Sequence, residues 1–238
     1  MGTRRTALLA NRDVHDSYAE GCGLVYSYYR VSKSKYMRPL LRHKSAAVAI
    51  HWLFQGILQM DATERAWKAA LDAILAGAIF FLFCWLKPMR LAQVYKAALA
   101  LLAAHTINFL LNAHFWVVLK HFGSVSNDWT TYQAELMRLR QRIAAEPYIR
   151  FAAAYGSLAR AQWSPHSDLD LRLVRAPGLN SALHVCWFAT RERARAFFRR
   201  FPLDVYVLDQ HASLANMAES ACPVILGGSD CSPAYQRE

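Results

Sequence analysis

The sequence predicts a C-terminal α/β domain with a small sheet, preceded by an all-α hydrophobic region. Helical and strand patterns alternate from residue 129 onward, and Pro177 and Gly178 end one of the strand patterns. Residues 46–119, in contrast, contain only five of the 28 Lys and Arg residues. These observations divide the 238-residue chain into a basic segment at 1–45, hydrophobic helices at 46–119 and an α/β domain at 125–238.

The α/β domain follows a turn-forming stretch in which Asp128 can cap the next helix. An amphipathic pattern that Pro147 closes predicts this helix, and period-two alternation predicts the strands. In chain order we expect a helix at 129–146, a strand at 148–155, a short helix at 158–162, a strand at 168–174, a helix at 179–200, a strand at 203–209 and a helix at 211–219.

Three apolar runs occupy the hydrophobic region, at 46–60, 69–86 and 97–119. The third has 23 residues without Asp, Glu, Lys or Arg. At about 1.5 Å per residue, such a helix can cross the roughly 30 Å hydrocarbon core of a bilayer. The second run carries one charge, Asp72, and the first is short enough for an interfacial helix. These lengths favour membrane-embedded helices over the buried helices of a soluble bundle.

Charge supports a membrane location. The net charge is +11, and nine basic residues against three acidic ones lie in residues 1–45, just before the first apolar run. This position favours anionic lipid headgroups over nucleic acid as the partner of the basic segment, and it places the segment in the cytoplasm.

Polar residues share one face of the third apolar run. His105, Asn108 and Asn112 are spaced as neighbours on a helix. They indicate either a functional group within the bilayer or interhelical hydrogen bonds that hold a bundle or homo-oligomer together.

Asp168 and Asp170 interrupt an otherwise hydrophobic strand pattern. Side chains two residues apart lie on the same face of a strand, so both carboxylates share one face. They repel each other unless a cation lies between them or they share a proton. Mg²⁺ satisfies this need, since it takes oxygen ligands and binds through one or two carboxylates together with substrate phosphates.

Gly156 and Ser157 form a tight turn between the preceding strand and a short helix. Glycine allows close approach of the backbone to a ligand, and a helix N-terminus favours phosphate. A phosphate-binding turn beside metal-binding carboxylates is typical of phosphoryl or nucleotidyl transfer.

The stretch "YGSLARAQWSPHSDLDL" resembles the signature of the DNA polymerase β-like nucleotidyltransferase superfamily, and most of all its minimal nucleotidyltransferase branch. Tyr155, Gly156 and Ser157 match its hydrophobic-Gly-Ser turn, and residues 168–171 match its Asp-hydrophobic-Asp-hydrophobic segment. The resemblance covers about residues 128–218 and implies a nucleotidyltransferase fold with a small mixed sheet.

The resemblance also implies further site residues. Asp204 corresponds to a third metal-binding acid, and Arg160 to an arginine that follows the Gly-Ser turn. Three carboxylates would hold two Mg²⁺ ions, or Mn²⁺ in their place, while Gly156, Ser157 and Arg160 bind the nucleotide. Ala161 stands where the family usually has glycine, a departure within the turn that leaves the metal ligands unchanged.

The expected function is transfer of NMP from an NTP to an acceptor at the membrane, a lipid-linked or glycan precursor. Transfer to a side chain of a partner protein, as in antitoxin members of the minimal branch, is an alternative. A non-catalytic membrane scaffold with a degenerate nucleotide-binding domain is another. An NTP-using domain belongs in the cytoplasm, and a cytoplasmic N-terminus then requires an even number of membrane spans.

Two other groups of residues have less specific interpretations. Asp209 follows a predicted strand and precedes a helix, so it is interpreted as an N-cap. An arginine-rich helix could meet triphosphate or lipid headgroups or form a solvated face; its arginines are Arg191, Arg193, Arg195, Arg199 and Arg200.

Overall fold

Four strands form one mixed sheet in the order β3-β2-β1-β4, in which only β2 and β3 are parallel. The computed structural model describes residues 44–57, 60–86, 92–112, 114–120, 125–215 and 223–230. The elements are α3 (Lys44–Phe54), α4 (Ala62–Trp85), α5 (Gln93–Leu111), α6 (His114–Lys120), α7 (Trp129–Ala144), β1 (Ile149–Tyr155), α8 (Gly156–Ala159), β2 (Leu169–Arg175), α9 (Leu179–Phe198), β3 (Leu203–Leu208), α10 (Ala212–Ala215) and β4 (Val224–Gly227). The predicted α/β class with a small sheet is confirmed. The basic segment lies almost entirely outside the described residues.

Most elements of the sheet region form where the sequence predicts them. Asp128 caps α7, because its Oδ1 accepts a hydrogen bond from the Thr131 N–H at 2.6 Å. Helix α8 begins at Gly156, two residues earlier than expected, and is a single turn. The sequence prediction misses β4, whose four residues are too few to show a period-two pattern.

The hydrophobic region differs from the prediction in its third apolar run. This run is not one helix, because α5 begins earlier, at Gln93, and ends at Leu111, and the short α6 begins at His114. Trp116 in α6 donates a hydrogen bond to the Phe197 carbonyl at 2.8 Å, so α6 packs on the sheet region.

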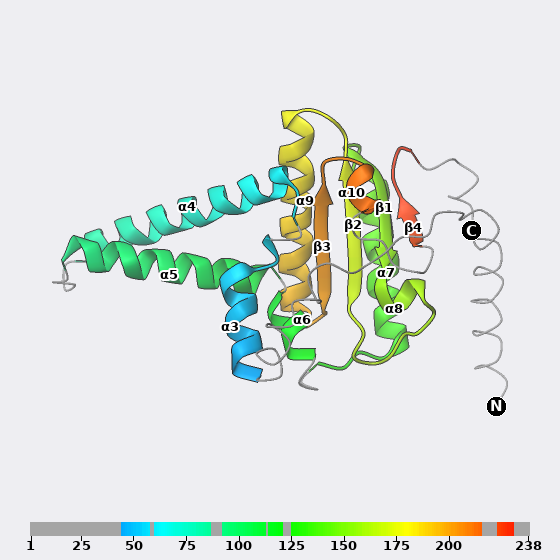
Figure 1. Cartoon of the computed structure of the whole chain (residues 1–238), viewed down its shortest axis with the longest axis horizontal. Coiled ribbons are helices and arrows are strands. Elements are labelled where there is room, and N and C mark those ends of the chain that lie inside the picture. Colours follow the sequence, from blue (N-terminus) through cyan, green and yellow to red (C-terminus); the bar gives the residue numbers. More distant parts are fainter. Residues whose placement is uncertain are drawn as a thin grey trace.

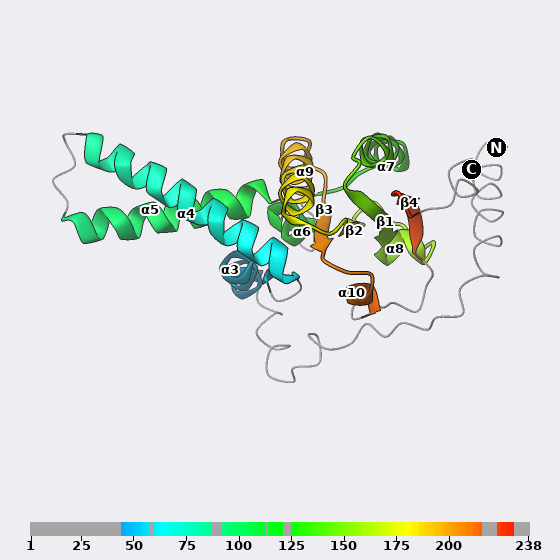
Figure 2. The ribbon, with the colours of Figure 1, turned by 90° about the horizontal axis from the view of Figure 1, so that it is seen from above.

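Helices α7 and α9 cover one face of the sheet, and α8 and α10 lie on the other side (Figure 2). The covered face carries Leu169, Leu171 and Leu173 of β2, which pack in one core cluster with residues of both helices. Because strand side chains alternate, the residues between these leucines project to the opposite face. The alternation that buries the leucines therefore places Asp170 on the more open face.

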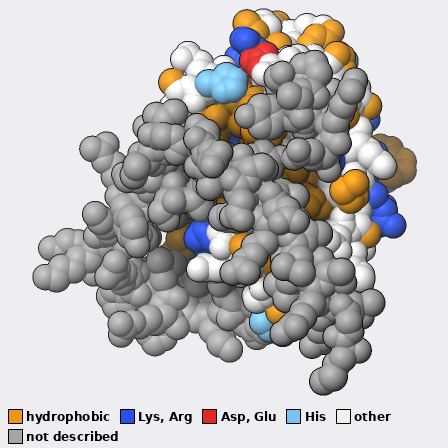
Figure 3. Space-filling view, turned by 90° about the vertical axis from the view of Figure 1, so that its right-hand side faces the viewer, with side chains coloured by type: hydrophobic (Ala, Val, Ile, Leu, Met, Phe, Trp, Pro, Cys, Tyr) orange, Lys and Arg blue, Asp and Glu red, His pale blue; other side chains and the backbone are white. Residues whose placement is uncertain are grey.

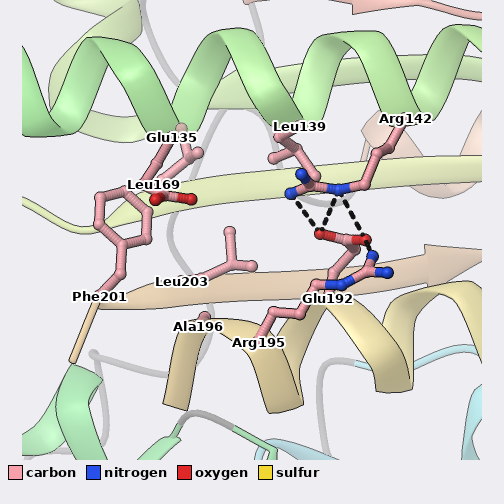
Figure 4. Close-up of a pocket in the computed structure, with 9 residues that line it drawn as sticks. All are labelled: Glu135, Leu139, Arg142, Leu169, Glu192, Arg195, Ala196, Phe201 and Leu203. Atoms are coloured by element: carbon pink, nitrogen blue, oxygen red, sulfur yellow. Dashed lines mark hydrogen bonds and ion pairs between the residues drawn. The ribbon is translucent and has the colours of Figure 1, made fainter. Parts of the chain in front are cut away.

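An ion-pair network joins α7 to α9 above the covered face (Figure 4). Arg142 donates to both carboxylate oxygens of the buried Glu192, at 2.7–2.9 Å, and Arg195 pairs with the same carboxylate. Glu135 of α7 accepts from Arg199 at 2.6 Å. The cavity among these side chains is about 10 Å³, too small for a ligand.

Helices α4 and α5 pack side by side and project away from the sheet as a hairpin (Figure 1). By length and composition, both are long and apolar enough to cross a membrane. Their polar residues face each other: Asn108 Nδ2 donates to Asp72 Oδ1 at 2.7 Å, and His105 Nδ1 lies 3.3 Å from Asp72 Oδ2. His105 and Asn108 thus make interhelical hydrogen bonds, as one of the two interpretations of these polar residues predicts.

The free edge of β3 is closed by side chains instead of another strand. Arg193 of α9 donates to the Val205 carbonyl, and Glu64 of α4 accepts from the Val207 N–H at 2.8 Å. Asp61, just before α4, accepts from the Asp209 N–H at 2.8 Å. Arg193 and Glu64 are fully buried and form an ion pair with each other.

The prediction that Asp209 caps the last helix is wrong. Its Oδ2 accepts from the Thr63 N–H in the first turn of α4, and its Oδ1 accepts from Arg175 Nε at 2.8 Å. Asp209 thus caps a helix that lies much earlier in the chain. These contacts fasten the base of the hairpin to the sheet.

We expect Glu64→Ala to lower the free energy of unfolding by about 3–5 kcal/mol, because Arg193 would remain buried without its carboxylate. The Val207 N–H would also lose its acceptor. Urea unfolding of the full chain in detergent micelles, followed by circular dichroism, measures the change.

Arg138→Ala is the matched control, because it removes an ion pair with Glu135 in which the arginine is exposed. Its cost should not exceed about 1 kcal/mol. Equal losses for the two variants would contradict a special role of the buried pair.

Candidate active site

The strand register places two of the predicted acids side by side. Asp170 of β2 lies opposite Asp204 of β3, and Tyr155 at the end of β1 lies opposite Asp170. Asp168 lies two residues before Asp170, just outside β2, where its carbonyl accepts from the Tyr132 hydroxyl at 3.2 Å. The three acids therefore lie at one end of two adjacent strands.

The glycine turn lies directly against Asp170. Gly156 has φ +71°, a left-handed conformation, and a Cβ at this position would overlap Oδ2 of Asp170. Glycine is therefore required here both by the backbone angle and by the carboxylate beside it. The structure thus brings Gly156 and Asp170 together, as the motif spacing predicts.

Ser157 and Arg160 occupy different surroundings in this turn. The Ser157 hydroxyl is buried and has no hydrogen-bond partner among the described residues. Arg160 is exposed, with Nε 3.3 Å from Oε1 of Gln162. Ala161 has φ +53°, so alanine adopts the left-handed conformation that glycine would take with less strain. The unexpected alanine thus keeps the turn at a cost in strain.

Asp204 has the most unusual environment of the three acids. Its Oδ1 is buried and has no hydrogen-bond partner among the described residues. Burial is the largest cause that raises the pKa of Asp204 to about 6; Arg172 opposes it, and Asp168 adds to it. Arg193 and Glu64 have smaller effects of opposite sign. This carboxylate is therefore expected to be stabilised by a proton or a cation.

The sequence prediction missed two cations near the acids. Arg172 lies two residues after Asp170 on the same face, is buried, and stacks 4.4 Å from the Tyr206 ring centroid. The period-two alternation that paired the acids could have placed it there. Lys68 of α4 is buried, interacts electrostatically with Asp204, and donates to the Gln55 carbonyl at 2.8 Å. No sequence signal links Lys68 to β3, because they belong to distant parts of the chain.

Asp168, Asp170 and Asp204 do not form a ready three-ligand metal centre. In the described part of the chain, no group of three His, Cys, Asp or Glu side chains could hold a metal ion. Their oxygen donors nevertheless match the preference of Mg²⁺, which needs only one or two carboxylates when phosphates complete its shell. The register pair Asp170–Asp204, with the buried unpaired Oδ1 of Asp204, fits such an ion.

A comparison with protein-family models finds no match to this chain, and a comparison with curated proteins finds none either.

Gly156→Ala should lower the free energy of unfolding by more than about 1 kcal/mol, because the added methyl group meets strain at positive φ and displaces Asp170. Denaturant unfolding measures the loss. Gly77→Ala in α4 is the control, since nothing lies within 4 Å of a Cβ there. It should be neutral or stabilising by up to about 1 kcal/mol. A neutral Gly156→Ala would mean that the turn does not need glycine.

The raised pKa of Asp204 predicts a pH dependence of stability in metal-free buffer. Asp204 binds its proton more tightly in the folded state than in the unfolded state, where the ordinary aspartate pKa of 3.8 applies. The free energy of unfolding therefore falls as the pH rises from 3.8 through about 6. The loss above pH 6 should be at most about 3 kcal/mol.

Asp204→Asn removes this titration. The difference in unfolding free energy between the wild type and this variant, measured in EDTA across this pH range, should follow the predicted fall. A difference that does not change with pH would contradict the predicted pKa.

Proposed function

We propose that this chain is a metal-dependent nucleotidyltransferase that moves NMP from an NTP to an acceptor at a membrane. One observation carries the proposal: a left-handed glycine turn fits against Asp170, and Asp204 lies beside Asp170 in the neighbouring strand. The motif resemblance to the DNA polymerase β-like superfamily supports the same assignment and a nucleotidyltransferase fold for the sheet region.

In the proposed reaction, an acceptor oxygen forms a bond to the α-phosphorus of the NTP and the bond to the β-phosphate oxygen breaks. Pyrophosphate leaves, and the proton of the acceptor passes to one of the carboxylates. Gly156 lets phosphate oxygens approach the backbone, and the unpaired Ser157 hydroxyl donates to them. Arg160, on the exposed side of the turn, attracts the triphosphate by charge.

Divalent cations would be held by Asp170 and Asp204, with Asp168 completing the set. Bound Mg²⁺ or Mn²⁺ would supply neutralisation of phosphate charge and activation of the acceptor. Two adjacent carboxylates, one with a buried unpaired oxygen, support this part of the proposal. A bound cation would relieve both their like-charge repulsion and the burial of an unpaired acceptor.

We place the α4–α5 hairpin in the membrane. Asp72 accepts a hydrogen bond from Asn108 of α5, so its charge is directed toward the other helix of the hairpin. From residue 69 to its end at Trp85, α4 rises about 26 Å, close to the thickness of the hydrocarbon core. Large apolar side chains are exposed along both helices: Ile74, Phe81, Leu82 and Trp85 on α4, and Val94, Tyr95, Leu99, Leu101 and Leu102 on α5.

Two spans would agree with the even number of spans that the sequence analysis predicts. With α3 only 11 residues long, α4 and α5 alone would cross and return, leaving the N-terminus and the sheet on one side. We assign that side to the cytoplasm, where NTP is found, so the acceptor is a lipid-linked or glycan precursor at the membrane.

The experiment is to incubate detergent-solubilised protein with Mg²⁺, membrane extract and each α-labelled NTP in turn. We expect label in the lipid fraction, and we expect Asp168→Asn/Asp170→Asn to lose it. Asp230→Asn is the control. Asp230 lies in the loop after β4, pairs with Arg150 of β1 and is outside the proposed site.

Each other outcome has a clear meaning. Label in a protein band would replace the lipid acceptor with a protein side chain. Absence of both transfer and metal-dependent NTP binding would favour a non-catalytic scaffold. Full transfer by the double variant would refute the assigned centre.

A further inference from the structure

Helix α9 has a second apolar face that the sheet does not use. Its inner side packs in the core through residues such as Val185 and Phe188. Leu179, Leu183 and Trp187 are spaced four residues apart and so share one outer side, where they are 76%, 48% and 51% exposed. Leucine and tryptophan exposed in a row on a surface helix are typical of a binding face.

This outer face of α9, consisting of Leu179, Leu183 and Trp187, continues onto the hairpin. Trp67 of α4 packs edge to face on Trp187, with ring centroids 6.5 Å apart, and donates to Thr190 Oγ1 at 2.9 Å. Figure 1 shows α9 running across the direction of the hairpin at its base. A layer that surrounds the hairpin would therefore meet α9 lengthwise.

The exposed charges of α9 are all basic. Its single acid, Glu192, is buried, whereas Arg191 is exposed and Arg195 is half-exposed. Arg200, just after the helix, extends this basic end, whereas Arg195 and Arg199 are also paired with Glu192 and Glu135. An apolar stripe bordered by arginines matches anionic lipid headgroups above acyl chains, where interfacial helices lie.

From the β4 side, the visible described side chains include hydrophobic, basic, acidic and histidine residues (Figure 3).

We propose that the outer face of α9 lies flat on the cytoplasmic lipid surface at the base of the hairpin, as a second membrane contact. This inference rests on the proposed membrane location of the hairpin and not on nucleotidyl transfer. Strand β3 lies next to α9 and is the sheet strand nearest the hairpin in both ribbon views (Figures 1 and 2). Asp204 therefore lies on the strand closest to the bilayer, and the acceptor group is one presented at the lipid surface.

The test uses single-cysteine variants of the full chain, labelled with an environment-sensitive fluorophore and reconstituted into vesicles of phosphatidylcholine and phosphatidylglycerol. The natural cysteines are replaced by serine or alanine. Leu183→Cys probes α9, Phe81→Cys probes the hairpin, and Met137→Cys on α7 is the control, matched to Leu183 by its 51% exposure. Lipids with nitroxide groups at headgroup or mid-chain depth quench the probes.

We expect headgroup-level nitroxide to quench the probe at 183, mid-chain nitroxide to quench the probe at 81, and neither to quench the probe at 137. If the probes at 183 and 137 respond alike while 81 is quenched, α9 does not touch lipid and the inference is wrong. An unquenched probe at 81 would instead refute the proposed membrane location of the hairpin. Disulfide cross-linking of Leu183→Cys between copies in detergent, without quenching in vesicles, would assign this face to a second copy and also overturn the inference.

Discussion

The outer edge of β3, which no other strand pairs, is the constraint on which the other features depend. An edge strand needs partners for its outward N–H and C=O groups, and here side chains provide them. Arg193 and Glu64 pair with each other in the interior and each also binds the β3 backbone. One ion pair thus closes the sheet, buries two charges and fixes the base of α4. The hairpin and the sheet consequently form one structural unit in the described part of the chain.

The more open face of the sheet carries the charged side chains of β2 and β3, because the covered face is packed with apolar side chains. Leucines of β2 fill the core under α7 and α9, so the intervening Asp170 and Arg172 have to lie on the other side. Asp204 joins them from β3 and has a buried oxygen without a hydrogen-bond partner among the described residues. A site for a cation and phosphates, as proposed, would satisfy these groups together, which is why the chemistry is assigned to this face.

The arrangement also relates the proposed chemistry to the proposed membrane. Strand β3 carries Asp204 and is fastened to α4, while α9 packs over the neighbouring strands and exposes Leu183 and Trp187 outward. As proposed, an acceptor in the lipid surface would meet the strand that carries Asp204 without leaving the bilayer. In that arrangement the hydrophobic region would be more than an anchor, because Lys68 of α4 also interacts electrostatically with Asp204.

Local patterns in the sequence determined most elements of the sheet region, the cap at Asp128 and the face of β2 on which Asp170 lies, because these depend on spacing within a few residues. They also determined the tight turn at Gly156. Only the tertiary structure decided that α5 ends before His114, that β4 completes the sheet and that Arg193 is buried against Glu64. Those outcomes depend on contacts between residues far apart in the chain, and local periodicity carries no information about which distant charge will meet which strand edge.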